Sequence, residues 1–375
     1  MIKEYTSLGL MSGTSGDGVD ASIITTNGID KFEVLKNQYF EYDKDLYLKI
    51  HELKAQIQNL EDLHKFKKEC DDLEKKITLF HAKVINDLSK KKTFQIVGFH
   101  GQTILHNSAN KITKQLGDEK LLYQLIKKNL VFNFRHKDIL NGGEGAPLTP
   151  IFHQVLANQL KIDLPSLILN IGGITNFTLI KNFTDPLSLI SKDIGPGNCL
   201  IDTWIRNNTK LKFDHDGDLA SKGITNKFVL EQAQEMFSYL NEKKNFSLDT
   251  NDFDMSFVRG LSLEDGASTL TDLTAKILIT TLSNILSSSS YDKCNIFICG
   301  GGRKNKYLIS KIKKDISKKV SINLIDDLGV NGDFIESQAF AFLAVRTILN
   351  LPISFPNTTG CKKPTIGGEL IRDLD

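Results

Sequence analysis

Three glycine-rich segments of the chain contain residue types that suit the binding of phosphate groups. They are Gly9–Asp20, Asn170–Asn176 and Gly300–Asn305, and each includes or follows a short apolar run. Small residues let backbone N–H groups approach phosphate oxygens, and Ser and Thr hydroxyls add further donors. The carboxylates of Asp17 and Asp20 could hold Mg²⁺ through water.

The first segment matches neither of two common phosphate motifs. No Gly-Lys-Ser/Thr follows it, which excludes a Walker loop. The residues after its glycines, Val19–Ile24, alternate like a second strand, whereas a dinucleotide-binding turn would open a helix. Taken alone, the segment has two interpretations: a phosphate loop, or a tight glycine hairpin without a ligand.

Three strand-and-glycine-turn segments in this order resemble the phosphate and adenosine segments of the actin, hexokinase and Hsp70 superfamily. That resemblance implies an α/β chain with a duplicated actin-like (ribonuclease H-like) fold and two lobes around an ATP cleft. Asp often stands in that superfamily where this chain has Asn170. The implied nucleotide-binding residues are Gly13, Thr14, Ser15, Gly16, Asp17, Gly18, Val19, Asp20, Asn170, Gly172, Gly173, Gly300, Gly301, Gly302 and Asn305.

Two further segments offer groups for catalysis and substrate binding. Asp193 precedes Gly195-Pro196-Gly197, and so tight a turn would fix its carboxylate as a base aimed at a bound water. The alternative is a carboxylate that caps its own turn. Arg135 begins a polar, glycine-rich loop, where its planar fork can clamp a carboxylate or form a structural ion pair with Asp138.

Taken together, these motifs resemble the anhydro-N-acetylmuramic acid kinase family nearly from end to end. The resemblance includes His100-Gly101-Gln102-Thr103, the Arg135–Pro150 loop, Asp193–Asn198, Glu336 and Thr359-Gly360. It implies that Asp193 is the catalytic aspartate and that ATP and Mg²⁺ are the cofactors. The implied substrate-binding residues are His100, Gln102, Arg135, Gly143, Glu144, Asp193 and Asn198, although His100 can equally be a satisfied core histidine.

The reaction implied by the resemblance is the hydrolytic opening of 1,6-anhydro-N-acetylmuramic acid with phosphorylation of O6. Its products are N-acetylmuramic acid 6-phosphate and ADP, and it belongs to peptidoglycan recycling. Three positions depart from the family, which usually has a large apolar residue at Gly16, Gln at Glu144 and Ala at Ser337. Gly16 would loosen the phosphate loop, and Glu144 would alter sugar contacts.

Two rival functions are compatible with the same glycine turns. An ordinary sugar or carboxylate kinase would need a base for a substrate hydroxyl and would cleave no glycosidic bond. An ATP-binding assembly or chaperone-like protein would phosphorylate no small molecule. The sugar-type loop at Arg135–Leu148 and the Asp193 segment disfavour the second rival.

The elements that must position these residues can be read from apolar periodicity. Strands are expected over residues 5–10, 19–25, 94–99, 166–171 and 295–299, and a pair of amphipathic helices over 44–92. The last helix is expected at 335–349, with Asp333 and Glu336 spaced as a capping box. Residues 1–148 with about 336–375 would form the N-terminal lobe, and residues 149–335 the C-terminal lobe.

Composition excludes several other classes of protein. The 375 residues include 47 Lys and Arg and 45 Asp and Glu, a net charge of +2 that argues against nucleic-acid and anionic-membrane partners. The five cysteines form no CxxC pair, which disfavours a zinc site or disulfide framework and favours the cytoplasm. Asp214, Asp216 and Asp218 lack the spacing of a calcium loop. The family resemblance implies a small-molecule sugar as the partner and a homodimer.

Overall fold

The computed structural model describes residues 3–108, 110–241, 247–287, 293–317 and 319–372. It divides into two compact units. Unit 1 comprises the chain up to Ile162, Phe183–Ile190 and the chain from Asp333, and unit 2 comprises Asp163–Asn182 and Ser191–Gly332. The expected boundary after residue 148 therefore falls later, because the next helix packs within unit 1. The centroid of the Phe152 ring in that helix lies 4.8 Å from the ring centroid of Phe32 and 5.6 Å from that of Phe342.

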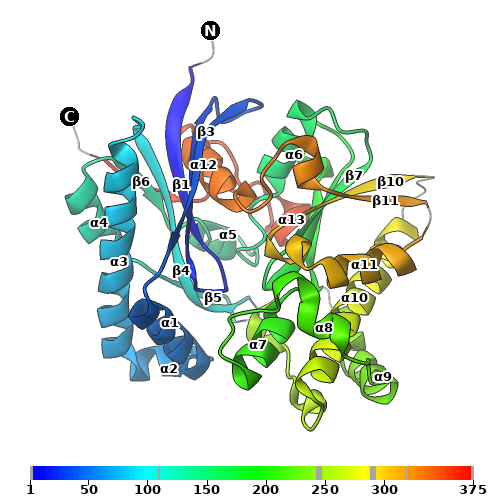
Figure 1. Ribbon diagram of the computed structural model, residues 1–375. Helices are drawn as coiled ribbons and strands as arrows, with labels where there is room; N and C mark the ends of the chain where they lie inside the picture. Colours follow the sequence, from blue (N-terminus) through cyan, green and yellow to red (C-terminus); the bar gives the residue numbers. More distant parts are fainter. Residues whose placement is uncertain (1–2, 109, 242–246, 288–292, 318, 373–375) are drawn as a thin grey trace. The chain divides into compact units, whose positions relative to one another are not determined.

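Unit 1 is built on one mixed sheet (Figure 1). In spatial order its strands are β12 (Glu369–Ile371), β6 (Asn129–Phe132), β4 (Ile96–Asn107), β1 (Tyr5–Ser12), β2 (Gly18–Thr26) and β3 (Phe32–Glu41), with β5 (Ile112–Leu116) paired to β4. Strand β4 is longer than expected, so His100 and Gln102 lie within it instead of in a loop after it.

Unit 2 contains a smaller sheet whose first strands pair in the same pattern as those of unit 1. Its order is β11 (Val320–Leu324), β10 (Cys294–Cys299), β7 (Ser166–Ile171), β8 (Ile174–Ile180) and β9 (Ile190–Pro196). In each unit the first strand pairs antiparallel with the second and parallel with the next strand inward, β1 with β2 and β4, and β7 with β8 and β10. The shared order confirms the predicted duplicated α/β fold.

Helices cover both faces of the unit 1 sheet (Figure 1). α12 (Ile335–Ile348) lies on one face, while α1 (Lys44–Gln56), α2 (Leu60–Lys65) and α3 (Lys67–Ser89) lie on the other. A Cβ at Gly9 would stand 1.9 Å from the Ser337 carbonyl oxygen, so glycine is required where α12 crosses β1. Unit 1 is completed by α4 (Glu119–Ile126), α5 (His136–Leu140), α6 (Pro150–Gln159) and α13 (Pro356–Thr359).

The predicted helical pair is in fact three helices. Ile57 leaves helical geometry after α1, and the Asn59 side chain caps the short α2 by accepting from the Asp62 N–H. Most of the predicted apolar stripe is buried in the unit 1 core, but Leu60 is 48% exposed. The periodicity therefore identified the packed faces of α1 and α3 and missed the break between them.

The helices of unit 2 pack around α10 (Leu263–Ser287). They are α7 (Cys199–Asn208), α8 (Asp218–Lys222), α9 (Lys227–Met236) and α11 (Lys306–Asp315). Trp204 of α7 is buried in this cluster, and its indole N–H donates to the Leu263 carbonyl at 2.9 Å. Among the described residues, no helix is both long and apolar enough to cross a membrane.

Buried histidines in unit 1 predict a loss of stability in acid. His153 of α6 is 1% exposed, and burial lowers its pKa from 6.5 to about 3. Between pH 6.5 and 5 the imidazole of His153 therefore becomes protonated in the unfolded chain but stays neutral in the folded chain. Stability falls by roughly 2 kcal/mol over that range from this group.

Replacing His153 by Gln should remove that share of the pH dependence, as measured by chemical denaturation at pH 5 and 7. The matched control is His64→Gln, because His64 is exposed in α2. A His153→Gln protein with the wild-type pH dependence would contradict the prediction.

Candidate active site

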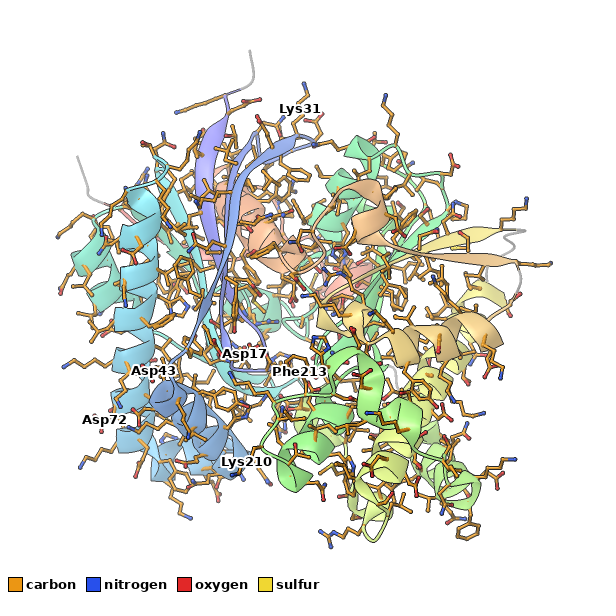
Figure 2. All side chains as sticks on the ribbon, in the orientation of Figure 1. Asp17, Lys31, Asp43, Asp72, Lys210 and Phe213 are labelled. Atoms are coloured by element: carbon orange, nitrogen blue, oxygen red, sulfur yellow. The ribbon has the colours of Figure 1, made fainter. Side chains whose placement is uncertain are left out.

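The loop between β1 and β2 is held by β4, by β3 and by the segment that follows β3. The Gly13 carbonyl accepts from the Gly16 N–H at 3.1 Å and from Gln102 Nε2 of β4 at 3.0 Å. The Asp17 carbonyl accepts from the Tyr39 hydroxyl of β3 at 2.9 Å and from the Tyr42 N–H at 3.0 Å. Figure 2 labels Asp17 in this loop. These bonds fix both ends of the segment predicted to bind phosphate.

A buried group of polar side chains lies at the end of β1, where the same loop begins. His81 Nδ1 lies 2.8 Å from the Ile77 carbonyl oxygen, so Nδ1 carries the proton and Nε2 is an acceptor. Ser12 Oγ lies 3.4 Å from His81 Nε2 and 2.9 Å from the Tyr42 hydroxyl. Burial lowers the pKa of His81 to about 4, so this arrangement is electrically neutral near pH 7.

The second glycine turn is closed by the segment that follows Asp193. The Gly172 carbonyl accepts from the Asn198 N–H at 2.8 Å, and the Gly173 carbonyl accepts from the N–H groups of Gly197 at 2.9 Å and Cys199 at 3.2 Å. Asn198, predicted to contact substrate, thus anchors this turn through its backbone.

The third glycine turn is fixed by a buried arginine. Arg303 is 6% exposed and binds both carboxylate oxygens of Asp326, with Nε at 2.6 Å and the NH2 nitrogen at 2.9 Å. It also donates to the Gly300 carbonyl at 3.0 Å. The Asn305 side chain caps α11 by accepting from the Leu308 N–H at 2.9 Å, so its oxygen is engaged within the protein.

Each of the three turns contains a glycine whose position has room for a side chain within the protein. A Cβ at Gly13, Gly172 or Gly301 would find its nearest neighbour at 3.7, 3.4 or 3.9 Å, which is ordinary van der Waals contact. None of the three has a positive φ. By contrast, a Cβ at Gly300 or Gly302 would stand 2.3 Å from another atom.

Asp193 lies in β9, so the expected rigid turn is instead the end of a strand. Gly195 and Pro196 are its last residues, and a Cβ at Gly195 would stand 2.7 Å from the Ile277 side chain. The Asp193 carboxylate accepts from the Leu248 N–H at 2.8 Å, a contact between residues 55 positions apart. A distant segment therefore helps to orient the carboxylate.

Arg135 and His100 form a bonded pair in unit 1. His100 Nε2 accepts from Arg135 Nε at 3.1 Å and lies 2.9 Å from the NH2 nitrogen, while its Nδ1 lies 2.8 Å from the Gly101 carbonyl oxygen. Burial, followed by the charge of Arg135, holds the pKa of His100 well below its ordinary value. Both ring nitrogens of the neutral His100 are thus engaged, and one of them orients Arg135.

Arg135 and Asp138 together hold the peptide groups of Gly145. Arg135 donates to the Gly145 carbonyl at 2.7 Å, and the Gly145 N–H donates to Asp138 Oδ2 at 2.7 Å. Asp138 is completely buried, and its Oδ1 accepts from Ser354 at 2.5 Å and from Thr359 at 2.7 Å. The glycine-rich loop is therefore tied to the C-terminal segment through one carboxylate.

Glu336 is a functional candidate for which the sequence predicted only a capping role. The capping-box prediction is wrong: α12 begins after Phe334, which makes no side-chain cap. Burial raises the pKa of the Glu336 carboxyl above its ordinary value, and the positive charge of Arg135 opposes that rise. The carboxyl is thus close enough to Arg135 to interact electrostatically.

Several other residues that were predicted to bind nucleotide or substrate also make contacts within the protein. Val19 is fully buried in the unit 1 core, so only its backbone can meet a ligand. A Cβ at Gly143 would stand 2.2 Å from Asp138 Oδ2, and one at Gly18 would stand 2.4 Å from the Phe40 carbonyl oxygen. The Glu144 N–H donates to the Thr359 carbonyl at 2.9 Å.

The acidic residues near the first loop form no complete metal site by themselves. Asp17 Oδ1 accepts from the Ser15 hydroxyl at 2.5 Å. Burial and then the charges of Asp17, Glu41 and Asp20 raise the pKa of the Tyr39 hydroxyl, which places all three carboxylates in one neighbourhood. Within the described ranges, no group of three or more His, Cys, Asp or Glu side chains is arranged to hold a metal ion. Asp214 instead caps α8 through the N–H groups of Leu219 and Ala220.

A family model and two curated relatives with the same description match this chain over nearly its whole length. A model of the anhydro-N-acetylmuramic acid kinase family matches residues 5–372. The anhydro-N-acetylmuramic acid kinase of Pelagibacter ubique is 51% identical over 377 residues, covering 100% of both chains. The protein of that name from Zymomonas mobilis is 37% identical, covering 97% of this chain and 98% of its own. Among solved structures, a hexokinase from Schistosoma mansoni complexed with glucose is 11% identical, with a TM-score of 0.36, covering 91% of this chain and 85% of its own.

The Asp138 contacts predict a selective loss of stability. In Asp138→Asn one acceptor oxygen becomes an NH2 group that faces a buried donor, which should cost about 1–3 kcal/mol of unfolding free energy. Chemical denaturation measures the loss. Asp87→Asn is the control, because Asp87 forms a surface pair with Lys90 at 3.1 Å and should change stability by less than about 0.5 kcal/mol. Equal effects of the two substitutions would show that Asp138 does not tie the loop to the C-terminal segment.

Proposed function

Since the chain belongs to the anhydro-N-acetylmuramic acid kinase family, we propose that it uses ATP to open and phosphorylate 1,6-anhydro-N-acetylmuramic acid. Water, ATP and the anhydro sugar are converted to N-acetylmuramic acid 6-phosphate and ADP. The proposed place of this reaction is the recycling of peptidoglycan in the cytoplasm, where ATP is available. The predicted ATP cleft and homodimer stay predictions.

The observation that carries the proposal is the set of three glycines with room for a side chain. Gly13, Gly172 and Gly301 have ordinary backbone angles and would meet no close protein atom as alanine. Glycine at such positions makes sense when a group outside the protein must approach the backbone. A triphosphate at two hairpins and an adenosine at the third turn fit that requirement.

Asp193 is the proposed base of the reaction. Water attacks C1 as the C1–O6 bond breaks, the water proton passes to the Asp193 carboxylate, and O6 takes the γ-phosphoryl group while ADP leaves. A carboxylate can accept such a proton when it is held in a fixed orientation. The Leu248 N–H bonded to Asp193 Oδ2 supports this role by limiting how the carboxylate can rotate.

The sugar is proposed to meet the Arg135 neighbourhood of unit 1. Arg135 carries a planar, permanently charged fork suited to a carboxylate such as the lactyl group. His100 and the Gly145 carbonyl orient that fork. Glu144 and Gly143 lie in the same loop, and burial raises the pKa of the Glu336 carboxyl, while the positive charge of Arg135 opposes that rise.

Mg²⁺ is proposed to accompany ATP, where it would neutralise charge on the phosphates. This ion commonly keeps several waters and binds through one or two carboxylates and substrate phosphates. Asp17 and Asp20 fit that pattern, since both charges act on Tyr39 beside the first loop.

A direct test of the function is sugar-dependent ADP release. We expect release with 1,6-anhydro-N-acetylmuramic acid and ATP, and only background release with N-acetylmuramic acid, N-acetylglucosamine or no sugar. Equal release without sugar would refute the kinase assignment. Faster release with a sugar that has a free 6-hydroxyl would favour an ordinary sugar kinase.

The last two glycines of the third turn, Gly301 and Gly302, predict opposite phenotypes. Gly301→Ala should fold with nearly wild-type stability and raise the KM for ATP roughly tenfold, by analogy with losing one good hydrogen bond. Gly302→Ala should lose about 1–3 kcal/mol of stability, because its Cβ would stand 2.3 Å from Ile171. Thermal unfolding and steady-state kinetics distinguish the two. An unchanged KM in Gly301→Ala would mean that no nucleotide approaches this glycine.

Asp193→Asn tests the proposed base. Asparagine keeps the size and can still accept from the Leu248 N–H, but it cannot take the water proton. Loss of a general base costs about 10²–10⁴ in rate, so kcat should fall by at least that range while both substrates still bind. Kinetics and calorimetric titration of each substrate supply the readout. Near-normal turnover would assign the proton transfer to another group.

A further inference from the structure

Two side chains of helix α1, to which the proposed function gives no role, contact carbonyl oxygens of the first glycine loop. Lys54 Nζ donates to the Thr14 carbonyl at 3.2 Å, and His51 Nε2 lies 2.9 Å from the Ser15 carbonyl oxygen. The two residues are three positions apart in α1, so they share one face of the helix. The helical segment therefore does more than cover the sheet.

Gly16 makes this contact possible. It has a φ of +58°, and a Cβ there would stand 2.9 Å from Ile50 Cγ2 and 3.7 Å from His51 Nε2. Both the backbone angle and the space next to α1 therefore favour glycine.

His51 and Lys54 add two contacts to the carbonyls along the loop. The Gly13 carbonyl is bound by Gln102 and the Asp17 carbonyl by Tyr39, and α1 binds two of the three carbonyls between them, those of Thr14 and Ser15. A backbone whose carbonyls are held in this way presents its N–H groups in a fixed arrangement. Such preorganisation removes part of the ordering cost that a flexible loop would incur on binding a phosphate chain.

We propose that His51 and Lys54 are positioning residues for the nucleotide phosphates. They hold the carbonyls of Thr14 and Ser15 against α1, so that the N–H groups and hydroxyls of the loop remain oriented for phosphate oxygens. The Lys54 ammonium also places a positive charge next to the loop. This inference rests on the proposed function, in which the loop binds ATP.

The test compares ligands with and without phosphates. Lys54→Met keeps the length of the side chain without its charge, and His51→Phe keeps a ring beside Tyr47, whose centroid lies 4.3 Å from that of His51. In the double variant, the Kd of a non-hydrolysable ATP analogue should rise roughly ten- to a hundredfold. The Kd of adenosine and the KM of the anhydro sugar should change less than about twofold, since neither ligand needs the loop amides.

Matched variants separate positioning from folding. Lys54→Arg and His51→Gln retain donors and should restore most of the affinity for the ATP analogue. Lys49→Met lies in the same helix, but Lys49 pairs with Asp45 at 2.8 Å instead of the loop, so it should leave the affinity unchanged. Thermal unfolding of all variants should agree within a few degrees.

Each result has a clear meaning. An unchanged Kd for the ATP analogue in the double variant would overturn the proposal, as would an equal loss for adenosine. If wild-type protein binds no nucleotide, the proposed function itself fails. If Gly13→Ala raises the Kd of the ATP analogue while the double variant does not, the loop binds the phosphates but His51 and Lys54 do not position it.

Discussion

Backbone amides bind a phosphate chain at a lower ordering cost when other groups already hold the loop that carries them. In this chain the groups that hold the first two loops come from residues far from them in sequence, whereas the third is held by its own Arg303 and the distant Asp326. Gln102 and Tyr39 hold the first loop, and the amides that follow Asp193 hold the second. Arg303 holds the third by joining the Gly300 carbonyl to Asp326. The sheets bring these partners to the strand ends, and the rest of the proposed site depends on that arrangement.

The same principle explains the substrate side of unit 1. Arg135 could not keep one orientation without an acceptor on each side, and His100 and the Gly145 carbonyl supply them. His100 can act as an acceptor only while neutral, and its burial favours that state. Asp138 then fixes Gly145 to the C-terminal segment, so residues at the end of the chain support a loop formed more than 200 positions earlier.

Local patterns predicted much of the fold, because strands and amphipathic helices have short periods. The bounds of β7 match the expected strand, and α12 ends one residue before its predicted end. Contacts between distant segments have no such signal. The bond from Leu248 to Asp193 and the engaged nitrogens of His100 were therefore not predictable from sequence. The Gly195-Pro196-Gly197 sequence suggested a turn, but pairing within the sheet made its first two residues part of a strand.

The proposed reaction requires water to supply the oxygen at C1 and the bridge oxygen O6 to take the γ-phosphoryl group. Turnover of 1,6-anhydro-N-acetylmuramic acid with ATP in ¹⁸O-labelled water, with the products analysed by mass spectrometry and NMR, measures where the water oxygen goes. One ¹⁸O atom is expected at C1 of N-acetylmuramic acid 6-phosphate and none in the phosphate ester. Label in the phosphate group, or an unlabelled C1, would show that water attacks elsewhere.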